Sequence, residues 1–419
     1  MAKRKDVLAI DGGTPVRKTP MPPRRLIGAA DRNAMLKFVD ACIESGEAIG
    51  YGGPMEKRYC QAFVRFMGGG YADAVNSGSN AVYCALAALQ LKPFSEVIVP
   101  AVTDPGGVMP IPLLNLVPVV ADSRPDSYNS SARQIAPLIN RRTSAIVVAH
   151  IGGSPVDMAP VVALARKHNL YLVEDCAQAH GATYRGKPVG TFGHIASFST
   201  MFGKHHSTGG QGGIVYSTSE DLHWRARRFA DRGKPFNISP RPAGNVIAGL
   251  NCNSSELAAC LGLVQIRKLP GAIRRRRKFA ADLARALKSH CHALRLAWEP
   301  PRSQSSAWFL VFRMDRSRLR ADKQTFCDAL NAEGIPCWSD YPSIPCDGPW
   351  FADQAVFGSS RLPWSSPTYR GPKKPVFKDH NLRRMLRSHF GMPFHERFGK
   401  RELNDIVTAL QKLERAYLR

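Results

Sequence analysis

Three short polar segments of the chain carry side chains whose types and spacing could do chemistry. The first segment, 76–81 (NSGSNA), lies directly before an apolar stretch that predicts a helix. A turn that opens a helix leaves backbone N–H groups unpaired at the positive end of the helix dipole. Gly78, Ser79 and Asn80 could therefore bind a phosphate group. A plain helix N-cap would use the same residue types, so this segment alone does not decide between the two.

The second segment follows an apolar run at 170–173 that predicts a buried strand. Asp175 comes at the carboxyl end of this strand, and Gln178 and His180 follow three and five residues later. In a parallel sheet this end of a strand faces the ligand crevice, so the carboxylate is a candidate binding group. Taken alone, these residues fit a solvated strand-to-loop transition better than a site.

The third segment brings Ser197 and Ser199 on a predicted strand and then Lys204 in a glycine-rich loop. A lysine that lies beside apolar strands can lose its water and have its pKa lowered, as a Schiff-base lysine requires. A surface lysine in a flexible loop is the simpler alternative. His205 and His206 could bind a metal, but no acidic residue or cysteine nearby completes a ligand set, so we predict no metal site.

Together the three segments favour one kind of chemistry over the separate alternatives. A phosphate-binding turn, an acid for a ring nitrogen and a lysine that can form an imine are what pyridoxal phosphate requires from a protein. They follow one another along the chain in the order turn, acid and lysine. The combination therefore predicts a pyridoxal phosphate enzyme.

The elements that must position these segments alternate between strands and helices. Short apolar runs predict six strands, at 97–100, 117–121, 145–149, 170–174, 195–199 and 213–217. Helical stretches lie between several of them, at 80–91, 131–139 and 158–168. This alternation predicts an α/β fold with a mostly parallel sheet that is covered on both faces.

The flanking regions predict an arm before the sheet and a smaller domain after it. A loop-rich arm precedes a helix at 31–45, and further helices are expected at 254–269, where Ser254 or Ser255 could be the N-cap, and at 274–287. From Leu294 the pattern becomes α+β, with a strand at 307–313, helices at 323–333 and 400–418, and an irregular loop at 358–380. We therefore predict an arm (1–30), a large domain (31–262) and a small C-terminal α+β domain (263–419).

The composition excludes some classes of protein. The chain has 419 residues, of which 44% are hydrophobic and 22% charged, and no apolar stretch is long enough to span a membrane. The first ten residues lack the apolar run of a secretory signal. None of the ten cysteines forms a Cys-x-x-Cys pair, so we expect free, mostly buried thiols in a reducing cytoplasm.

The formal net charge of +25 is the unusual feature of the composition. Residues 71–220, which carry the three polar segments, have a net charge of only +1, whereas 221–360 and 361–419 have +10 and +9. A solvated basic face is the simpler explanation. A more specific explanation is that some of these basic side chains bind an anionic substrate such as a nucleotide diphosphate. Nucleic-acid binding is disfavoured, because no basic stripe with interleaved aromatic residues accompanies the charge.

The sequence resembles the DegT/DnrJ/EryC1/StrS family of pyridoxal-phosphate-dependent sugar aminotransferases. The likeness extends from about Leu8 to the C-terminus and is strongest between 76 and 265. It is carried by several ordered stretches: 76–81 (NSGSNA), 96–100 (EVIVP), 174–182 (EDCAQAHGA), 197–199 (SFS), 203–204 (GK), 212–213 (GG) and 249–257 (GLNCNSSEL).

The resemblance implies a fold type I pyridoxal phosphate enzyme and a role for each matched residue. Lys204 would form the internal aldimine, Asp175 would pair with the pyridine nitrogen, and Gln178 would lie beside the ring hydroxyl. The phosphate would be bound by Gly78, Ser79, Asn80 and Ser199. Asn253 would reach the phosphate of a neighbouring subunit, so a homodimer with shared active sites is expected.

The resemblance also implies two half-reactions, in which glutamate or glutamine donates an amino group and a ketone accepts it. The acceptors in this family are mostly nucleotide-linked keto-sugars, with some cyclitols and small carbocycles. One alternative within the family is a dehydratase that has histidine in place of the lysine. Lys204 stands five residues after Ser199, where the family lysine belongs, and His205 is one residue late. A cofactor-binding regulator without turnover is a further alternative.

Two departures from the family pattern concern the substrate side. Asp104 stands where many relatives have an aromatic residue that stacks on the cofactor ring. Gly152–Gly153 stands where relatives often have a bulky residue before the glycine. We expect these positions to affect the substrate class more than the cofactor.

Overall fold

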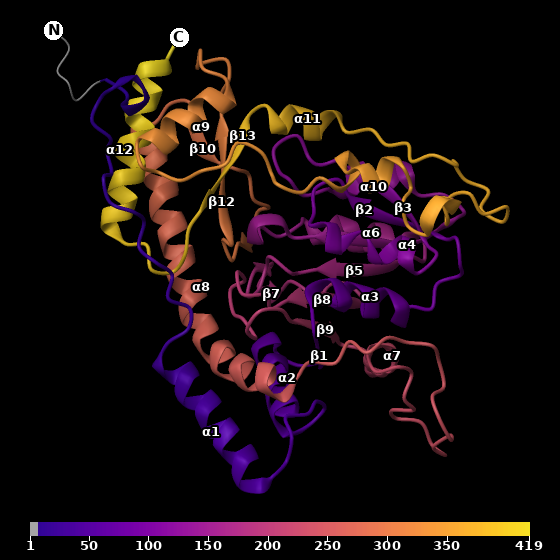
Figure 1. Ribbon diagram of the computed structural model, residues 1–419. Coiled ribbons are helices and arrows are strands. Elements are labelled where there is room, and N and C mark those ends of the chain that lie inside the picture. The colour runs from indigo at the N-terminus through magenta and orange to yellow at the C-terminus, as the bar shows by residue number, and fades with distance from the viewer. Residues whose placement is uncertain (1–6) are drawn as a thin grey trace.

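A seven-stranded sheet forms the centre of the computed structural model, which describes residues 7–419 (Figure 1). The first six residues of the predicted arm lie outside this range. The strand order is β1-β9-β8-β5-β4-β2-β3. In that order the strands are Tyr71–Val75, Gly213–Ser217, Ile195–Ser199, Tyr171–Asp175, Thr143–Ala149, Glu96–Pro100 and Val117–Ala121.

The strand directions confirm the mostly parallel sheet. The five strands β3, β2, β4, β5 and β8 run parallel, while β9 is antiparallel to both β8 and β1. The six predicted strands all exist, with ends shifted by at most two residues. The sequence pattern missed β1, which is short, rich in alanine and interrupted by the buried Asp73.

Helices cover both faces of this sheet, as a parallel sheet requires. Along β2, Val97 and Val99 pack in the cluster that holds α3, whereas Ile98 packs in the cluster that holds α6. The helices of this part are α1 (Ala29–Ser45), α2 (Pro54–Met67), α3 (Gly78–Ala88), α4 (Pro110–Leu113), α5 (Ala132–Ile135), α6 (Met158–Lys167) and α7 (Glu220–Ala230). Short 3-10 helices lie at Ala9–Asp11, Pro105–Gly107, Ala136–Leu138, Ile151–Gly153, Pro345–Asp347 and Gly358–Ser360.

One long helix, α8 (Glu256–His290), connects the large sheet to the rest of the chain (Figure 1). The two helices predicted at 254–269 and 274–287 are therefore one element, which continues through Pro270. The Ser255 hydroxyl accepts a hydrogen bond from the Ala258 N–H, so Ser255 rather than Ser254 is the N-cap. The predicted domain boundary after residue 262 falls inside α8.

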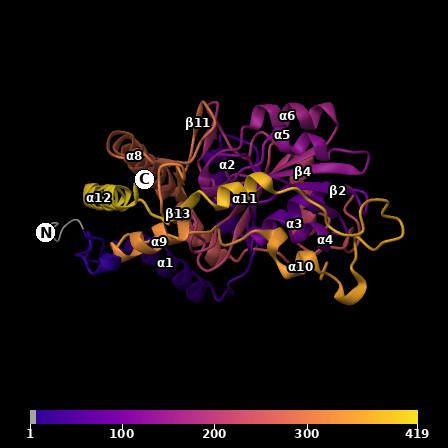
Figure 2. The ribbon, with the colours of Figure 1, turned by 90° about the horizontal axis from the view of Figure 1, so that it is seen from above.

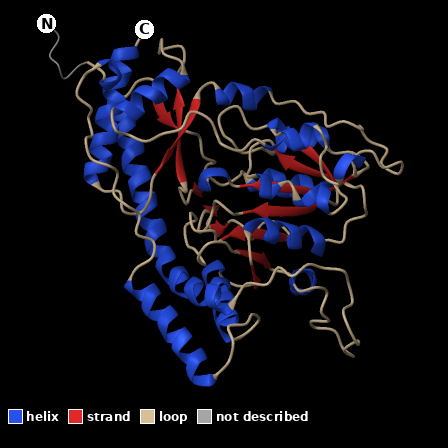
Figure 3. Ribbon diagram, in the orientation of Figure 1, coloured by secondary structure: helices blue, strands red, loops and turns tan. Residues whose placement is uncertain are grey.

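A second, antiparallel sheet lies beside the upper part of α8 (Figures 1 and 3). Its strands are β10 (Leu294–Leu296), β12 (Phe309–Met314) and β13 (His389–Pro393), in that order. Helices α8, α9 (Lys323–Ala332) and α12 (Lys400–Tyr417) pack around one hydrophobic core with it, which confirms the smaller α+β unit. A third, very small sheet joins β11 (Ser303–Gln304), β6 (Thr183–Tyr184) and β7 (Lys187–Pro188).

Part of the C-terminal region returns to the large sheet (Figure 2). The segment that carries α10 (Pro349–Ala352) and α11 (His380–Leu386) places Trp364 and Tyr369 in the same core cluster as Leu86 of α3. The Tyr369 hydroxyl donates to Glu96 Oε1 over 2.9 Å. Between these helices the segment is irregular, as predicted. This segment belongs to the predicted small domain by sequence, but it packs in the core of the large sheet. The limits of the two domains therefore stay a prediction.

The N-terminal arm is anchored on the smaller unit. The buried carboxylate of Glu333 accepts the backbone N–H groups of Ala9 and Val16 at 2.8 and 3.0 Å. Further along the arm, Arg24 donates to the carbonyl oxygens of Gly203 and His205 at 3.3 and 3.0 Å. The arm therefore reaches the loop that carries Lys204.

Candidate active site

The predicted site residues come from strand ends that meet at one edge of the sheet. Parallel strands β2, β5 and β8 end at this edge, and the loops that follow them are close together. Asp175 is the last residue of β5, Ser199 is the last residue of β8, and Lys204 lies in the next loop. The parallel sheet therefore brings the second and third polar segments together.

Lys204 is buried, with 7% of its surface exposed. Its Nζ lies 3.8 Å from the centre of the Trp308 ring, which covers it from the smaller unit. Burial lowers the pKa of Lys204 to about 8, while the nearby carboxylates of Asp175 and Asp104 act in the opposite direction. A substantial fraction of this amine is therefore neutral near pH 8, the form in which it is a nucleophile and a base.

Asp175 is also buried, and its Oδ1 accepts the Ala177 N–H over 3.0 Å. Burial raises the pKa of this carboxyl group, whereas the Ala177 hydrogen bond and the charge of Lys204 lower it. The other oxygen faces the turn after β2, because a methyl group added to Gly107 would lie 2.9 Å from Oδ2. A cationic ligand atom placed here would find a desolvated carboxylate.

The predicted phosphate turn opens α3, and the Ser77 hydroxyl caps the helix by accepting the Asn80 N–H over 3.1 Å. The backbone N–H groups of Gly78 and Ser79 have no hydrogen-bond partner in the described part of the chain. Ser199 lies beside the turn, since a methyl group on Gly78 would lie 2.9 Å from its Oγ. Free donors and two hydroxyls at a helix N-terminus can bind a phosphate dianion.

The side-chain amides of Asn80 and Asn253 are both engaged in hydrogen bonds to neighbouring asparagines. The amide of Asn80 donates to Asn76 Oδ1 over 2.6 Å, and the amide of Asn253 donates to Asn251 Oδ1 over 2.7 Å. The backbone beside Asn253 does run along the turn, because the Asn76 N–H donates to the Cys252 carbonyl over 2.8 Å. Within one chain, these two amides are therefore held by neighbouring asparagines.

Gln178 is fixed at both ends of its amide. Its Oε1 accepts the Gly152 N–H and its Nε2 donates to the Tyr341 hydroxyl, both over 2.8 Å. Tyr341 is a buried residue that the sequence pattern did not indicate. These bonds orient Gln178 toward the cavity beside Lys204, which both Gln178 and Tyr341 line.

The histidines of the second and third segments have structural hydrogen bonds. The ring of His180 bonds to the Ser199 carbonyl over 2.8 Å, and burial lowers its pKa to about 3, so it is neutral. The Nε2 atoms of His205 and His206 bond to the Ser306 carbonyl and the Tyr59 hydroxyl at 3.2 and 2.8 Å. These three buried rings therefore stabilise the Lys204 loop through hydrogen bonds to neighbouring elements.

Among residues 7–419, one buried group has the composition of a metal site, namely His150, Glu174 and Cys176. The Glu174 carboxylate bonds to His150 Nε2 over 3.1 Å and accepts three backbone N–H groups from residues 190, 192 and 193. The other nitrogen of His150 accepts the Val156 N–H over 2.9 Å. The His150 ring and the Glu174 carboxylate thus bond to each other and to backbone N–H groups, and they organise a loop.

The first departure from the family pattern, Asp104, has a clear local role. Its Oδ1 accepts the Gly106 N–H over 2.9 Å and caps the 3-10 turn Pro105–Gly107. A methyl group on Gly106 would overlap the Ser79 hydroxyl, so this turn approaches the phosphate segment by its bare backbone. The Asp-Pro-Gly-Gly sequence of the turn was the signal that could have indicated it.

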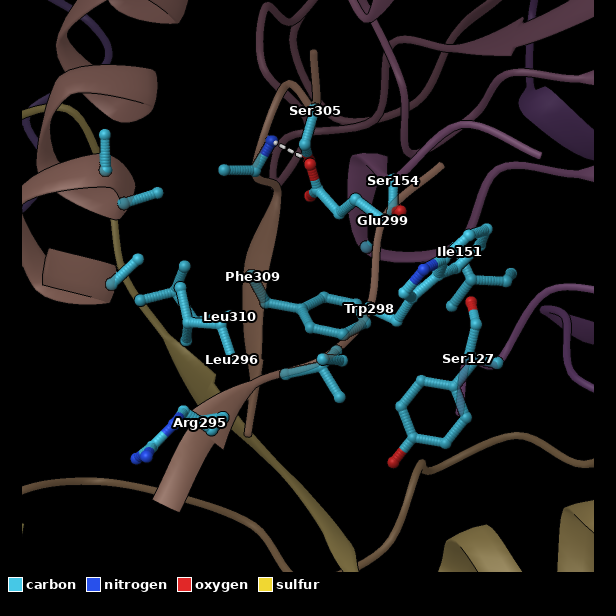
Figure 4. A pocket seen from close by; sticks show the side chains of 18 of the residues that line it. Ser127, Ile151, Ser154, Arg295, Leu296, Trp298, Glu299, Ser305, Phe309 and Leu310 are labelled. Carbon is cyan, nitrogen blue, oxygen red and sulfur yellow. Dashed lines mark hydrogen bonds between the residues drawn. The ribbon is translucent and has the colours of Figure 1, made fainter. Parts of the chain in front are cut away.

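The second departure, Gly152, is covered by Phe309. Gly152 has a left-handed φ of 66°, and a methyl group there would lie 3.2 Å from the Phe309 ring. Phe309 therefore packs directly against the bare backbone of Gly152. Phe309 also lines two cavities: one of ≈ 620 Å³ beside Lys204, which Gly203 and Trp308 border, and one of ≈ 690 Å³ between the two sheets. Figure 4 shows Phe309 in the wall of the second cavity.

The cavity beside Lys204 is the candidate substrate site. Asp104, Gln178 and Gly203 line it on the side of the large sheet. Aromatic residues of the smaller unit, chiefly Trp308 and Trp338, form most of the opposite wall. The cavity is therefore an apolar, aromatic space with the Asp104 carboxylate in its wall, and one of its lining rings, Trp308, contacts the Lys204 amine.

Comparison with known proteins identifies the same family that the sequence motifs resemble. Residues 30–371 match the model of the DegT/DnrJ/EryC1/StrS aminotransferase family. The chain is 33% identical over 293 residues to an L-glutamine:2-deoxy-scyllo-inosose aminotransferase of Micromonospora echinospora, which covers 67% of this chain and 69% of the relative. It is 31% identical to a dTDP-4-dehydro-2,6-dideoxy-D-glucose 3-dehydratase of Saccharopolyspora spinosa, over 77% of this chain and 74% of the relative.

The fold matches as well. An aminotransferase from Psychrobacter cryohalolentis superposes with a TM-score of 0.81 at 25% identity, over 93% of this chain and 98% of that one. This likeness confirms the expected fold type I, and the family model covers well over half of the sequence. The chain therefore belongs to the DegT/DnrJ/EryC1/StrS aminotransferase family, and it is a pyridoxal-phosphate-dependent aminotransferase.

Proposed function

We propose that this enzyme moves the amino group of glutamine or glutamate to the ketone of a sugar or a cyclitol. The observation that carries the proposal is the desolvated Lys204 amine, which lies against Trp308, a wall residue of the ≈ 620 Å³ cavity, and within the electrostatic influence of the buried Asp175. The two relatives described above support the acceptor class, because one is named for a cyclitol and the other for a nucleotide-linked keto-sugar.

The residues present fit pyridoxal phosphate. We assign Gly78, Ser79, Asn80 and Ser199 to its phosphate, Asp175 to its ring nitrogen and Gln178 to the region of its ring hydroxyl. The free N–H groups of the α3 turn and the buried Asp175 carboxylate support these assignments. When bound, the cofactor supplies an electron-withdrawing ring and a carrier for the amino group.

Lys204 is assigned three tasks, which its environment suits. It binds the cofactor covalently, and its released amine takes a proton from the substrate carbon and returns it. A pKa of about 8 keeps the amine close to the balance between base and acid at physiological pH. Trp308 limits water access to this amine, since its ring lies 3.8 Å away and its Nε1 donates to the Gly203 carbonyl.

The dehydratase remains the second candidate, because one of the two relatives above is named as one. The side chains argue against it. The Lys204 amine contacts the ring of Trp308, which lines the cavity, whereas the ring of the neighbouring His205 bonds to the Ser306 carbonyl. The His205 ring is thus held by a backbone carbonyl, which argues against its taking the place of the lysine.

We further infer a homodimer with shared active sites, in the cytoplasm. Several large apolar side chains on α1 and the loop after it are exposed in the single chain, among them Ile43 at 73%, Leu36 and Ile49. Leu250 is exposed beside Asn251 and Asn253, as expected for a surface that meets a second copy. All ten cysteines are free, which fits a reducing compartment. No helix among the described residues has the length and apolar character to cross a membrane.

The amino-donor half of the reaction tests the proposed function directly. Adding glutamine or glutamate to the loaded enzyme is expected to shift the visible cofactor band to that of the amine form. In Lys204→Ala the rate of this shift is expected to fall by at least about 10²-fold, because the proton-transferring amine is lost. Stopped-flow absorbance measures it. The exposed Lys187 provides a control, since Lys187→Ala leaves the rate unchanged. A shift as fast in Lys204→Ala as in the wild type contradicts the proposal.

The turn Pro105–Gly107, which lies against Ser79, gives a prediction about cofactor binding. Gly106→Ala is expected to weaken pyridoxal phosphate binding by about 10-fold or more, because the new methyl group overlaps the Ser79 hydroxyl. Fluorescence titration of the apoenzyme measures the dissociation constant. Gly50→Ala is the matched control, since a methyl group there has no atom within 4 Å. Equal affinity in the two variants would show that this turn does not border the phosphate.

Mixed dimers test the shared active site. Asn253→Ala alone and Lys204→Ala alone are both expected to be impaired. Mixing the two variants should restore activity, because one site of each mixed dimer then combines an intact Lys204 with an intact Asn253 from the other chain. Activity that stays at the level of the separate variants, in mixtures shown by mass spectrometry to contain mixed dimers, rules out this role for Asn253.

A further inference from the structure

A second cavity lies between the two sheets, and the proposed reaction leaves it unused. Its volume is ≈ 690 Å³, which is within the range of small-molecule sites. We call it the inter-sheet cavity. Figure 4 shows Phe309 and Leu296 between Arg295 at one end of this cavity and Glu299 at the other. An apolar middle with charged ends is the shape of a site for an amphipathic molecule.

One face of helix α8 creates the space with small side chains. The residues of this helix that line the inter-sheet cavity are Arg277, Ala280, Ala281, Ala284 and Lys288. Spacings of three and four residues place 277, 280, 284 and 288 on one side of the helix. The alanines leave room opposite the ring of Phe309, and a basic residue stands at each end of the row. Eleven residues separate Arg277 from Lys288, or about 16 Å along the helix axis.

The end of the cavity near Arg277 is electrically balanced. Arg277 donates to the Ser305 carbonyl over 2.9 Å, and Figure 4 shows Glu299 beside Ser305. Glu299 is the single acidic residue among the described residues that line the cavity. Its charge offsets that of Arg277, so this end has little net charge.

The other end carries two cations and no acid. Arg295 Nη1 donates to the Cys291 carbonyl over 2.6 Å, at the C-terminal end of α8 and one turn beyond Lys288. The Nε and Nη2 atoms of Arg295 and the Nζ of Lys288 have no hydrogen-bond or ion-pair partner in the part of the chain that the structure describes. The helix C-terminus attracts both cations, yet their free N–H groups remain available to an anionic group.

The wall on the side of the large sheet contains two hydroxyl groups without partners. Tyr128 and Ser154 both line the cavity, and neither hydroxyl has a hydrogen-bond partner among residues 7–419. Tyr128 is only 4% exposed. A buried polar group without a partner is destabilising, and a polar atom of a bound molecule would relieve this cost.

The inter-sheet cavity lies away from the surface inferred for a second copy. Its lining includes Gln304 of β11 and Ser154, four residues before α6. Figure 2 shows β11 and α6 on the opposite side of the molecule from α1, whose exposed apolar residues we assign to the dimer. We therefore expect the cavity to stay open in the dimer.

We propose that the inter-sheet cavity binds an amphipathic anion, a molecule with an apolar ring or chain and one anionic group. The apolar part lies between the alanine face of α8 and the rings of Phe309 and Trp298, and the anionic group meets Lys288 and Arg295. Because Phe309 is also in the wall of the substrate cavity, a bound molecule contacts a side chain that both cavities share. This site goes beyond the proposed function and is detected without turnover.

The test uses two dyes that differ in one group. The probe is 8-anilinonaphthalene-1-sulfonate, and its neutral twin is N-phenyl-1-naphthylamine, which lacks the sulfonate. Dye emission is measured while cofactor-loaded enzyme is titrated in, and it gives a dissociation constant for each dye. In Ala284→Phe both dyes are expected to bind at least about 10-fold more weakly, because the new ring fills the space beside α8. Ala163→Phe, at an exposed alanine of α6, is the matched control and keeps the wild-type affinities.

A charge reversal tests the anionic end separately. Lys288→Glu is expected to weaken binding of the sulfonate by at least about 5-fold and to leave the neutral dye unchanged. Lys167→Glu is the control, since Lys167 is an exposed lysine in the last turn of α6 as Lys288 is in the last turn of α8. The glutamine-driven shift of the cofactor band, measured in every variant, shows that each one is folded and loaded.

The outcomes distinguish this site from the proposed function. Wild-type affinity of Ala284→Phe for both dyes overturns the site, because the dyes then bind elsewhere. An equal effect of Lys288→Glu on the two dyes overturns the anionic end and with it the ligand class. A wild type that binds the dyes as expected, but forms no amine form of the cofactor with glutamine or glutamate, overturns the proposed function alone.

Discussion

The burial of one ammonium group, that of Lys204, is the constraint on which the rest of this active site depends. Lowering its pKa from 10.5 to about 8 corresponds to a net destabilisation of its charged form by about 3 kcal/mol, because the loss of solvation outweighs the attraction of Asp175 and Asp104. The full penalty applies below pH 8, where the folded and unfolded chains both bind the proton, and it is relieved as the pH rises toward 10.5. Without cofactor the site therefore lowers stability at neutral pH, and this is the cost of a reactive amine.

Distant parts of the chain converge to hold this amine in place. The arm contributes Arg24, which holds two carbonyls of the Lys204 loop, and α2 contributes Tyr59, which bonds to His206. The smaller unit contributes Trp308, which covers Nζ and bonds to Gly203. Each of these contacts lies more than 100 residues away from the loop in sequence. The Lys204 loop is thus the place where the arm, the large sheet and the smaller sheet meet.

The same convergence explains what could be predicted from sequence. Asp175, Ser199 and Lys204 follow strands whose apolar runs are easily recognised, and the carboxyl ends of parallel strands must meet. Their proximity was therefore predictable. Trp308, Tyr341 and Arg24 have no such local signal, because only tertiary packing brings them to the lysine. The continuous α8 was also missed, since Pro270 is tolerated there by a helix packed on both units.

The pKa of Lys204 in the cofactor-free enzyme is the most direct test of this account. Competitive labelling of all lysines with a trace of acetic anhydride, between about pH 6 and 11 and followed by peptide mass spectrometry, yields a titration curve for each amine. We predict a midpoint near 8 for Lys204 and ordinary midpoints near 10.5 for exposed lysines. A midpoint near 10.5 for Lys204 would contradict the claim that burial prepares this amine for catalysis.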